Sequence, residues 1–185
     1  MALEIECTPR LSQPLMDGVW LRPLEMHVDD RGSVTELFRD SWKLGPELVQ
    51  WNLVSSRAGI VRGVHFHLIR HDFLCVVSGR ASVGLYDVRR SSTTYKKRLL
   101  VEMTGEKLSA ITIPPGVVHG FYSNEDSLLA CGFSEQWDPG DDFGCHWADP
   151  ELAIPWPVTH AYCSDKDDKL PPFKALVDQL PNWLG

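Results

Sequence analysis

Short apolar segments separated by turn residues recur along most of this sequence. The apolar segments fall at residues 18–24, 48–54, 73–77, 81–88, 99–103, 109–114 and 127–133. Within residues 81–86, Ala, Val and Leu alternate with Ser, Gly and Tyr, which is the pattern of a strand with one buried face. Apolar segments of strand length at this spacing predict an all-β sandwich or barrel.

Turn and helix signals fit the same architecture. Turn residues separate the predicted strands at Asp29–Gly32, Ser78–Gly79, Thr104–Gly105, Pro114–Gly116 and Asp138–Asp141. Helical patterning appears only near the end, where residues 172–180 predict a short helix with Pro at its start. We therefore expect one domain over residues 1–170, with residues 171–185 as a tail that packs on it.

Composition and charge exclude several classes of protein. With 185 residues, 43% of them hydrophobic and 23% charged, the chain has the composition of a globular domain. Its net charge of −7 gives no general attraction for nucleic acid or an anionic membrane. No apolar run reaches the length of a membrane span, and the N-terminus lacks a signal-peptide pattern. The five cysteines (Cys7, Cys75, Cys131, Cys145 and Cys163) form no Cys-x-x-Cys pair, so we expect packed thiols in a reducing cytoplasm.

Histidines gather in two distant segments, residues 62–72 and 113–121. His65 and His67 lie two positions apart, so on a strand they face the same side. The two segments resemble the two cupin motifs, represented here by His65, His67, Asp72 and Gly79, and by Pro114, Gly116 and His119. The resemblance implies a cupin jelly-roll, a β-sandwich or barrel with a short C-terminal helical tail, in which His65 and His119 meet inside one cavity.

A more specific resemblance covers roughly residues 10–170. It is carried, in order, by Asp29–Glu36, Gln50–Asn52, Arg62–His65, Asp87–Thr94, Ile113–Phe121, Trp147–Pro150 and Ser164–Asp167. These blocks resemble the dTDP-4-dehydrorhamnose 3,5-epimerase family, a branch of the cupins. The resemblance implies an epimerase or isomerase of a nucleotide-diphosphate 4-keto-6-deoxy sugar, with dTDP as the expected nucleotide. It also implies a homodimer that needs no cofactor.

The resemblance assigns roles to individual residues. It implies that His65 is the base that removes a proton at C3 or C5 of the sugar, and that Asp167 holds its ring. A ketone at C4 acidifies those protons, and a neutral imidazole is a suitable base near neutral pH. The expected contacts to sugar or diphosphate come from Arg31, Glu36, Gln50, Asn52, Arg62, His119, Lys166 and Trp137.

Three positions depart from the family pattern. His67 stands where the family usually has Gln, and Asp72 stands where it usually has a Lys that stabilises the enolate oxygen. Trp137 stands where a Tyr usually returns a proton, and an indole N–H is not a usable proton donor at neutral pH.

These departures leave two alternative hypotheses open. His65, His67, Asp72 and His119 form a plausible ligand set for one divalent transition metal, which would make the chain a metal-dependent cupin enzyme acting on another small molecule. Alternatively, the chain is a non-catalytic member that keeps a nucleotide-sugar pocket as a binding module.

Overall fold

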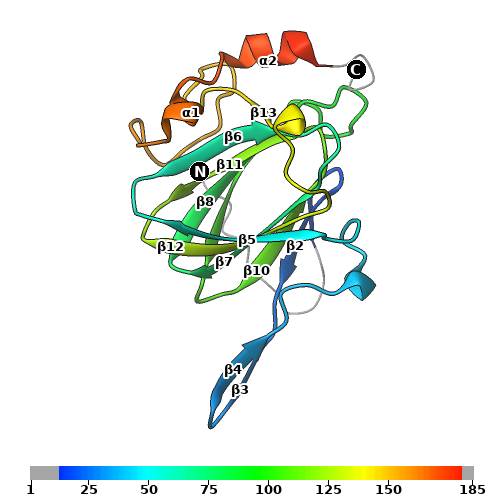
Figure 1. The fold of residues 1–185 in the computed structure, drawn as a ribbon, viewed down its shortest axis with the longest axis vertical. Helices are drawn as coiled ribbons and strands as arrows, with labels where there is room; N and C mark the ends of the chain where they lie inside the picture. Colours follow the sequence, from blue (N-terminus) through cyan, green and yellow to red (C-terminus); the bar gives the residue numbers. More distant parts are fainter. Residues whose placement is uncertain (1–12, 181–185) are drawn as a thin grey trace.

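Residues 13–180 form two antiparallel β-sheets packed face to face, as the computed structural model shows (Figure 1). The six-stranded sheet has the order β1 (Gln13–Met16), β2 (Val19–Pro23), β10 (Ser109–Ile113), β7 (Asp72–Ser78), β12 (Ser127–Phe133) and β5 (Gln50–Ser56). The five-stranded sheet has the order β13 (Phe143–Gly144), β6 (Val61–Phe66), β11 (Val117–Ser123), β8 (Arg80–Asp87) and β9 (Arg98–Thr104). The predicted all-β sandwich is confirmed.

The main core lies between the two sheets. Apolar side chains from both sheets point inward and are fully or almost fully buried, among them Leu74, Val83, Ile111 and Leu129. Burying such side chains removes apolar surface from water, which is the dominant favourable contribution to folding. At one end of the sandwich this packing gives way to a cavity, described below.

A second apolar layer covers the outer face of the five-stranded sheet. The chain after β13 returns across that face and ends in α1 (Asp165–Asp168) and α2 (Phe173–Gln179). Phe173 of α2 lies edge-on to Tyr86, with ring centres 5.0 Å apart, and Leu176 is buried beside it. The predicted terminal helix and its packing on the β body are therefore confirmed.

This cover corrects the expectation of one buried face for residues 81–86. Ser82 and Tyr86 are buried on the face opposite to Val83, and Gly84 lies directly beneath Trp156 and Ile154. Both faces of β8 are buried because a distant part of the chain packs on the second one. A strand pattern alone does not reveal such a cover.

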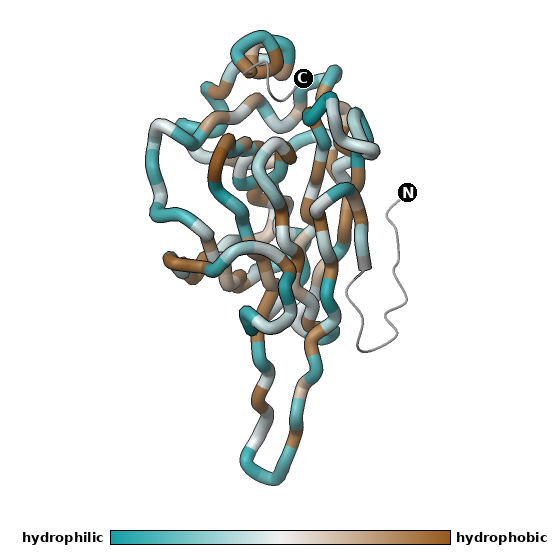
Figure 2. Tube along the Cα trace, turned by 90° about the vertical axis from the view of Figure 1, so that its right-hand side faces the viewer, coloured by the Kyte–Doolittle hydropathy of each residue, from teal (hydrophilic) through white to brown (hydrophobic). Residues whose placement is uncertain are grey.

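A hairpin made of β3 (Met26–Asp29) and β4 (Gly32–Thr35) projects from the sandwich (Figures 1 and 2). Its turn is the predicted one at residues 29–32, and the Asp29 carboxylate accepts hydrogen bonds from Arg31. Val28 and Val34 are 73% and 68% exposed. The hairpin therefore presents apolar side chains to its surroundings. Two single-turn 3₁₀ helices, Asp40–Trp42 and Pro139–Asp141, complete the elements.

The block at residues 87–94 has a structural role. The Asp87 carboxylate is fully buried and accepts hydrogen bonds from Arg89, Ser92 and Thr94. Burial alone disfavours its charged form, but these donors outweigh burial and hold the pKa of Asp87 below its ordinary value. The Asp-x-Arg and Ser-x-Thr residues thus tie down the connection between β8 and β9.

The cysteines agree with the expectation of packed thiols. Cys75, Cys131 and Cys145 are buried and free, and burial raises the pKa of each thiol to about 12. Cys163 is also free, and Cys7 lies outside the described residues. Within residues 13–180, none of the helices has the length and apolar content needed to span a membrane.

The turn from β7 to β8 requires glycine at position 79. Its φ is +75°, and a Cβ there would lie 2.2 Å from the backbone oxygen of Asp126. We expect Gly79→Ala to lower the free energy of unfolding by about 3 kcal/mol, since it adds both backbone strain and overlap. Urea unfolding measures the loss.

The matched control is Gly59→Ala. Gly59 also has a positive φ, of +82°, but nothing lies within 4 Å of a Cβ built there. We expect a loss of only about 1 kcal/mol, from strain alone. Equal losses in the two variants would show that the close approach at Gly79 contributes nothing.

Candidate active site

A cavity of about 690 Å³ opens at one end of the space between the sheets. Its walls combine the inner faces of both sheets with the segment that carries α1. The predicted site residues among its lining are Arg62, His65, Asp72, His119, Trp137, Lys166 and Asp167. The expectation that His65 and His119 share one cavity is confirmed.

A bulge at Gly63 places His65 against His119. The two histidines are cross-strand partners on β6 and β11, and the register shifts before the next pair, Gly63 and Gly120. Gly63 has a φ of +95°, and a Cβ there would come within 3.0 Å of the His119 backbone oxygen. The glycine of the Arg-Gly-x-His block is therefore needed both for its φ and for the close approach of the two strands.

His65 is paired with the buried carboxylate of Asp167. The Nε2 atom of His65 lies 2.9 Å from Oδ1 of Asp167, and the ring is 27% exposed to the cavity. Ser164 caps α1 by accepting a hydrogen bond from the Asp167 backbone N–H, which fixes the carboxylate's position. Burial disfavours the charged carboxylate, but the hydrogen bond and charge of His65 outweigh burial, so the pKa of Asp167 lies below its ordinary value.

This pairing determines the tautomer of His65. A carboxylate only accepts hydrogen bonds, so Nε2 carries the proton and Nδ1 keeps its lone pair. The lone pair makes Nδ1 the basic atom of the ring. Asp167 would also stabilise the imidazolium that forms when Nδ1 gains a proton.

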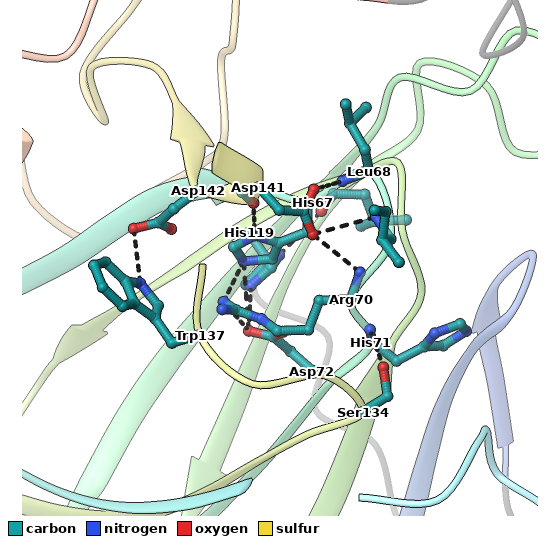
Figure 3. Close-up of polar contacts among 12 residues, drawn as sticks. His67, Leu68, Arg70, His71, Asp72, His119, Ser134, Trp137, Asp141 and Asp142 are labelled. Atoms are coloured by element: carbon teal, nitrogen blue, oxygen red, sulfur yellow. Dashed lines mark hydrogen bonds and ion pairs between the residues drawn. The ribbon is translucent and has the colours of Figure 1, made fainter. Parts of the chain in front are cut away.

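A second polar network is buried at the cavity, and three of its four side chains, Arg70, Asp72 and His119, line it (Figure 3). Arg70 stands at its centre: Nε donates to Oδ1 of Asp72 at 2.8 Å, and Nη2 donates to Nε2 of His67 at 2.6 Å. His119 contacts the other carboxylate oxygen of Asp72 through Nε2, at 3.1 Å. The four side chains therefore form one connected cluster, which we call the Arg70 cluster: His67, Arg70, Asp72 and His119.

Hydrogen-bond partners assign the protons in the Arg70 cluster. The Nδ1 atom of His67 faces the Asp141 carbonyl at 2.6 Å and must donate, so Nε2 is bare and accepts from Arg70. His119 faces acceptors on both sides, since Nδ1 contacts the Val117 carbonyl at 3.0 Å and Nε2 contacts Asp72. His67 is then neutral, and both ring nitrogens of His119 are in contact with protein oxygens.

The pKa shifts agree with that assignment. Burial lowers the pKa of His67 to about 4, so the ring is neutral at pH 7. Burial alone would raise the pKa of Asp72, but His119, His67 and Arg70 outweigh it and bring that pKa well below its ordinary value. The cluster therefore pairs the Arg70 guanidinium with the Asp72 carboxylate.

The proposed metal set is not assembled as expected. Among the described residues, the His, Cys, Asp and Glu side chains close enough to share an ion are His67, Asp72 and His119. His65 is absent from that group, and it is paired instead with Asp167. In this structure Nε2 of His67 contacts Arg70, and both nitrogens of His119 contact protein oxygens. The ring nitrogens of this group therefore already have protein partners.

Trp137, Asp142 and Lys166 form one wall of the cavity. The Trp137 indole N–H donates to Oδ2 of Asp142 at 3.3 Å, and Nζ of Lys166 donates to the same oxygen. Burial opposes ionisation of Asp142, but the Lys166 hydrogen bond outweighs it, so its pKa lies below the ordinary value. The indole N–H of Trp137 is therefore engaged by Asp142.

The remaining predicted binding residues divide into two groups. Arg62 lines the cavity and donates to the Ser55 backbone oxygen. Gln50 lies beside the wall, where it accepts from the Trp137 backbone N–H and donates to Asn52. Arg31 and Glu36 are not brought to this cavity: the Arg31 side chain is 90% exposed in the hairpin turn, and Glu36 pairs with Arg39.

Reading the sequence missed Arg70, Asp141 and Asp142. The Asp141 carboxylate accepts hydrogen bonds from the backbone N–H groups of Leu68, Ile69 and Arg70. These bonds fix the loop that carries Arg70. Arg70 stands within the histidine-rich segment at residues 62–72, Asp141 is the last residue of the predicted turn at Asp138–Asp141, and Asp142 follows that turn. The sequence position of Arg70 indicated only that it lies near the site, and the positions of the two aspartates indicated only a turn.

Comparisons with known proteins agree over nearly the whole chain. The profile of the family described as dTDP-4-dehydrorhamnose 3,5-epimerase matches residues 14–175. A dTDP-4-dehydrorhamnose 3,5-epimerase of Methanothermobacter thermautotrophicus is 28% identical over 175 residues, which cover 89% of this chain and 95% of the relative.

Two solved structures extend the comparison to the fold. The rmlC epimerase of Mycobacterium tuberculosis is similar with a TM-score of 0.87 and 26% identity, covering 94% of each chain. A dTDP-6-deoxy-D-glucose-3,5-epimerase from Legionella pneumophila, solved with dTDP-4-keto-L-rhamnose, is similar with a TM-score of 0.80 and 25% identity, covering 92% of this chain and 94% of that one. The sandwich is thus the cupin fold of these epimerases.

Burial of His67 makes stability depend on pH. The unfolded chain takes up a proton near pH 6.5, whereas the folded ring resists protonation down to about pH 4. Its contribution is therefore complete above pH 6.5 and is lost as the pH falls. Between pH 7 and pH 5 we expect this residue alone to cost about 2 kcal/mol in the free energy of unfolding, measured with urea.

A His67→Gln variant tests the assignment, since its amide oxygen still accepts from Arg70 but does not titrate. Between pH 7 and pH 5, the free energy of unfolding of this variant should fall by about 2 kcal/mol less than that of the wild type. His160→Gln, at an exposed position, is the control and should follow the wild type. Identical pH dependence in His67→Gln and wild type would contradict the prediction.

Proposed function

The chain belongs to the dTDP-4-dehydrorhamnose 3,5-epimerase family, and on that basis we propose that it is an epimerase of a dTDP-4-keto-6-deoxy sugar. In this proposal His65 removes the proton at C3, at C5 or at both. The observation that carries the proposal is the His65–Asp167 pair, which leaves Nδ1 of His65 bare at a cavity large enough for a sugar. The family relationship supports the substrate class.

The proposed reaction begins with proton transfer to His65. The C–H bond next to the ketone breaks, its proton goes to Nδ1, and its electron pair forms a carbon–carbon double bond with C4. The π electrons of the carbonyl move to O4, which gives an enolate. A proton supplied by water to the opposite face of the same carbon then restores the ketone with inverted configuration.

The diphosphate and sugar would be held by the polar groups around the cavity. Arg62 and Lys166 supply positive charge at its lining, and guanidinium groups suit phosphate oxygens because their donors are paired in one plane. Gln50 and Asn52 stand beside the wall with amide groups that suit sugar hydroxyls. Trp137 presents an aromatic face on which a sugar or base stacks. His119 lines the cavity, and both of its ring nitrogens contact protein oxygens.

The proposed chemistry uses these side chains alone and needs no cofactor. The free state of the four described cysteines supports a reducing compartment, for which the cytoplasm is our proposal.

We also propose that the enzyme is a homodimer in which the β3–β4 hairpin packs against the second copy. An isolated two-stranded hairpin is marginally stable in water, and this one exposes Val28 and Val34. The edge strand β5 exposes Trp51 and Leu53, which offer an apolar surface of the same kind. Packing of the hairpin would bring Arg31, and Glu36 just after it, toward the second copy, where we propose they contact its substrate.

Hydrogen exchange in heavy water tests the proposed reaction. We expect the wild-type protein to introduce deuterium at C3 or C5 of a dTDP-4-keto-6-deoxy hexose, followed by NMR. His65→Ala should slow exchange roughly a thousandfold because the base is lost, while the Kd for dTDP stays unchanged. Asp167→Asn should slow it roughly a hundredfold, because the amide no longer enforces the tautomer with Nδ1 bare.

The control for exchange is His71→Gln. Its ring points away from the Arg70 cluster in Figure 3 and does not line the cavity, so exchange should stay at the wild-type rate. Wild-type protein that binds dTDP but exchanges no hydrogen would make the chain a non-catalytic binding member and overturn the proposal.

Analytical ultracentrifugation tests the dimer. We expect the wild type to sediment as a dimer at micromolar concentration and Val28→Asp to sediment as a monomer, since a charge would enter the apolar interface. Val28→Thr, which keeps the shape and strand propensity, should remain dimeric. A wild type that sediments as a monomer would contradict the proposal.

A further inference from the structure

Removal of a proton next to a ketone places negative charge on the ketone oxygen. In a cavity with little water, that charge needs a preorganised hydrogen-bond donor, and the contribution of such a donor to rate is usually large. The cationic side chains that line this cavity are Arg57, Arg62, Arg70 and Lys166. Of these four, Arg70 alone is buried, with 6% of the residue exposed.

The Arg70 guanidinium is fixed in one orientation from several directions. Asp72 and His67 accept from Nε and Nη2, and the guanidinium carbon lies 4.5 Å above the ring of Phe133. The backbone N–H of Arg70 donates to the Asp141 carboxylate at 3.2 Å. A side chain held in this way has already lost its rotamer freedom, so presenting it to a ligand costs little further entropy.

One nitrogen of this guanidinium is left over. Arginine has five N–H donors, and the partners of Arg70 among the described residues use only Nε and Nη2. The Nη1 nitrogen, with its two N–H bonds, makes no hydrogen bond to any described residue, and Arg70 borders the cavity. The structure therefore contains a fixed cation with free donors at the wall of the proposed active site.

We propose that Arg70 is a catalytic residue whose Nη1–H groups donate to the O4 oxyanion formed when His65 deprotonates the sugar. The inference rests on the proposed function and names the group that the reaction still requires. As the C–H bond breaks, its electron pair forms the C=C bond and the carbonyl pair moves to O4. Arg70 would donate hydrogen bonds to the negative charge that develops on O4. That charge disappears when the carbon is reprotonated and the ketone forms again.

The other cations of the cavity are less suited to this role. Lys166 is paired with Asp142, and Arg62 is exposed with its Nη2 committed to the Ser55 carbonyl. Arg57 is exposed too. Both ring nitrogens of His119 already contact protein oxygens. Asp72 takes part indirectly: it is a positioning residue that holds Arg70. The carboxylate of Asp72 thus orients the guanidinium of Arg70, two residues before it.

The test compares exchange rate with ligand binding in three variants of the full-length protein. We expect Arg70→Gln to lower the kcat of deuterium exchange about a hundredfold, with the Kd for dTDP unchanged by calorimetry. Arg70→Lys keeps a cation but has fewer donors, and its kcat should fall about tenfold. Arg80→Gln removes an exposed arginine paired with Glu125 outside the cavity, and it should leave kcat unchanged.

The outcomes separate this inference from the proposed function. If the wild type exchanges and the kcat of Arg70→Gln lies within threefold of it, the role of Arg70 is overturned and the proposed function stands. A wild type without any exchange would overturn the proposed function and this inference together. If Arg70→Gln does not fold, as judged by circular dichroism, Arg70→Lys carries the test: a tenfold lower kcat at unchanged Kd supports the inference, and a wild-type kcat overturns it.

Discussion

The hydrogen bond between Asp167 and His65 is the interaction on which this site depends. It decides which imidazole nitrogen carries a proton and therefore which one faces the cavity as a base. Two local features make it possible: the bulge at Gly63, which sets the ring against β11, and the cap at Ser164, which fixes the carboxylate. The Gly63 backbone N–H also donates to Asp167, at 3.4 Å, so the bulge contributes to both partners.

The same reasoning about donors and acceptors explains the buried Arg70 cluster. A carboxylate, a guanidinium and two imidazoles are costly to bury singly, but here each has a partner for its charge or its protons. The cavity is lined by both the His65–Asp167 pair and the Arg70 guanidinium. In the proposed reaction, this arrangement would favour the charge distribution of an enolate over that of the neutral ketone.

Much of this could be predicted from the sequence, because much of it is local. Alternating apolar positions and turn residues identify strands, and the two motif segments identify the cavity that His65 and His119 share. What could not be predicted depends on distant segments. Ser82 and Tyr86 are buried by the returning C-terminal segment, and Arg70 is positioned by Asp141, which lies 71 residues further along the chain. Motif spacing placed Asp72 at the site, but only the fold shows that it pairs with Arg70.

The position of Asp167 near the end of the chain affects how the enzyme matures. The aspartate follows His65 by 102 residues, and it reaches the site only after the segment covering the five-stranded sheet has docked. Ribosomes add about 5–20 residues each second, and the N-terminal part of a chain folds first. A polypeptide released before position 164 would retain the strands of both sheets but not the carboxylate that sets the tautomer of the imidazole. An oriented base at position 65 therefore requires the covering segment, and a product that stopped before position 164 would lack one.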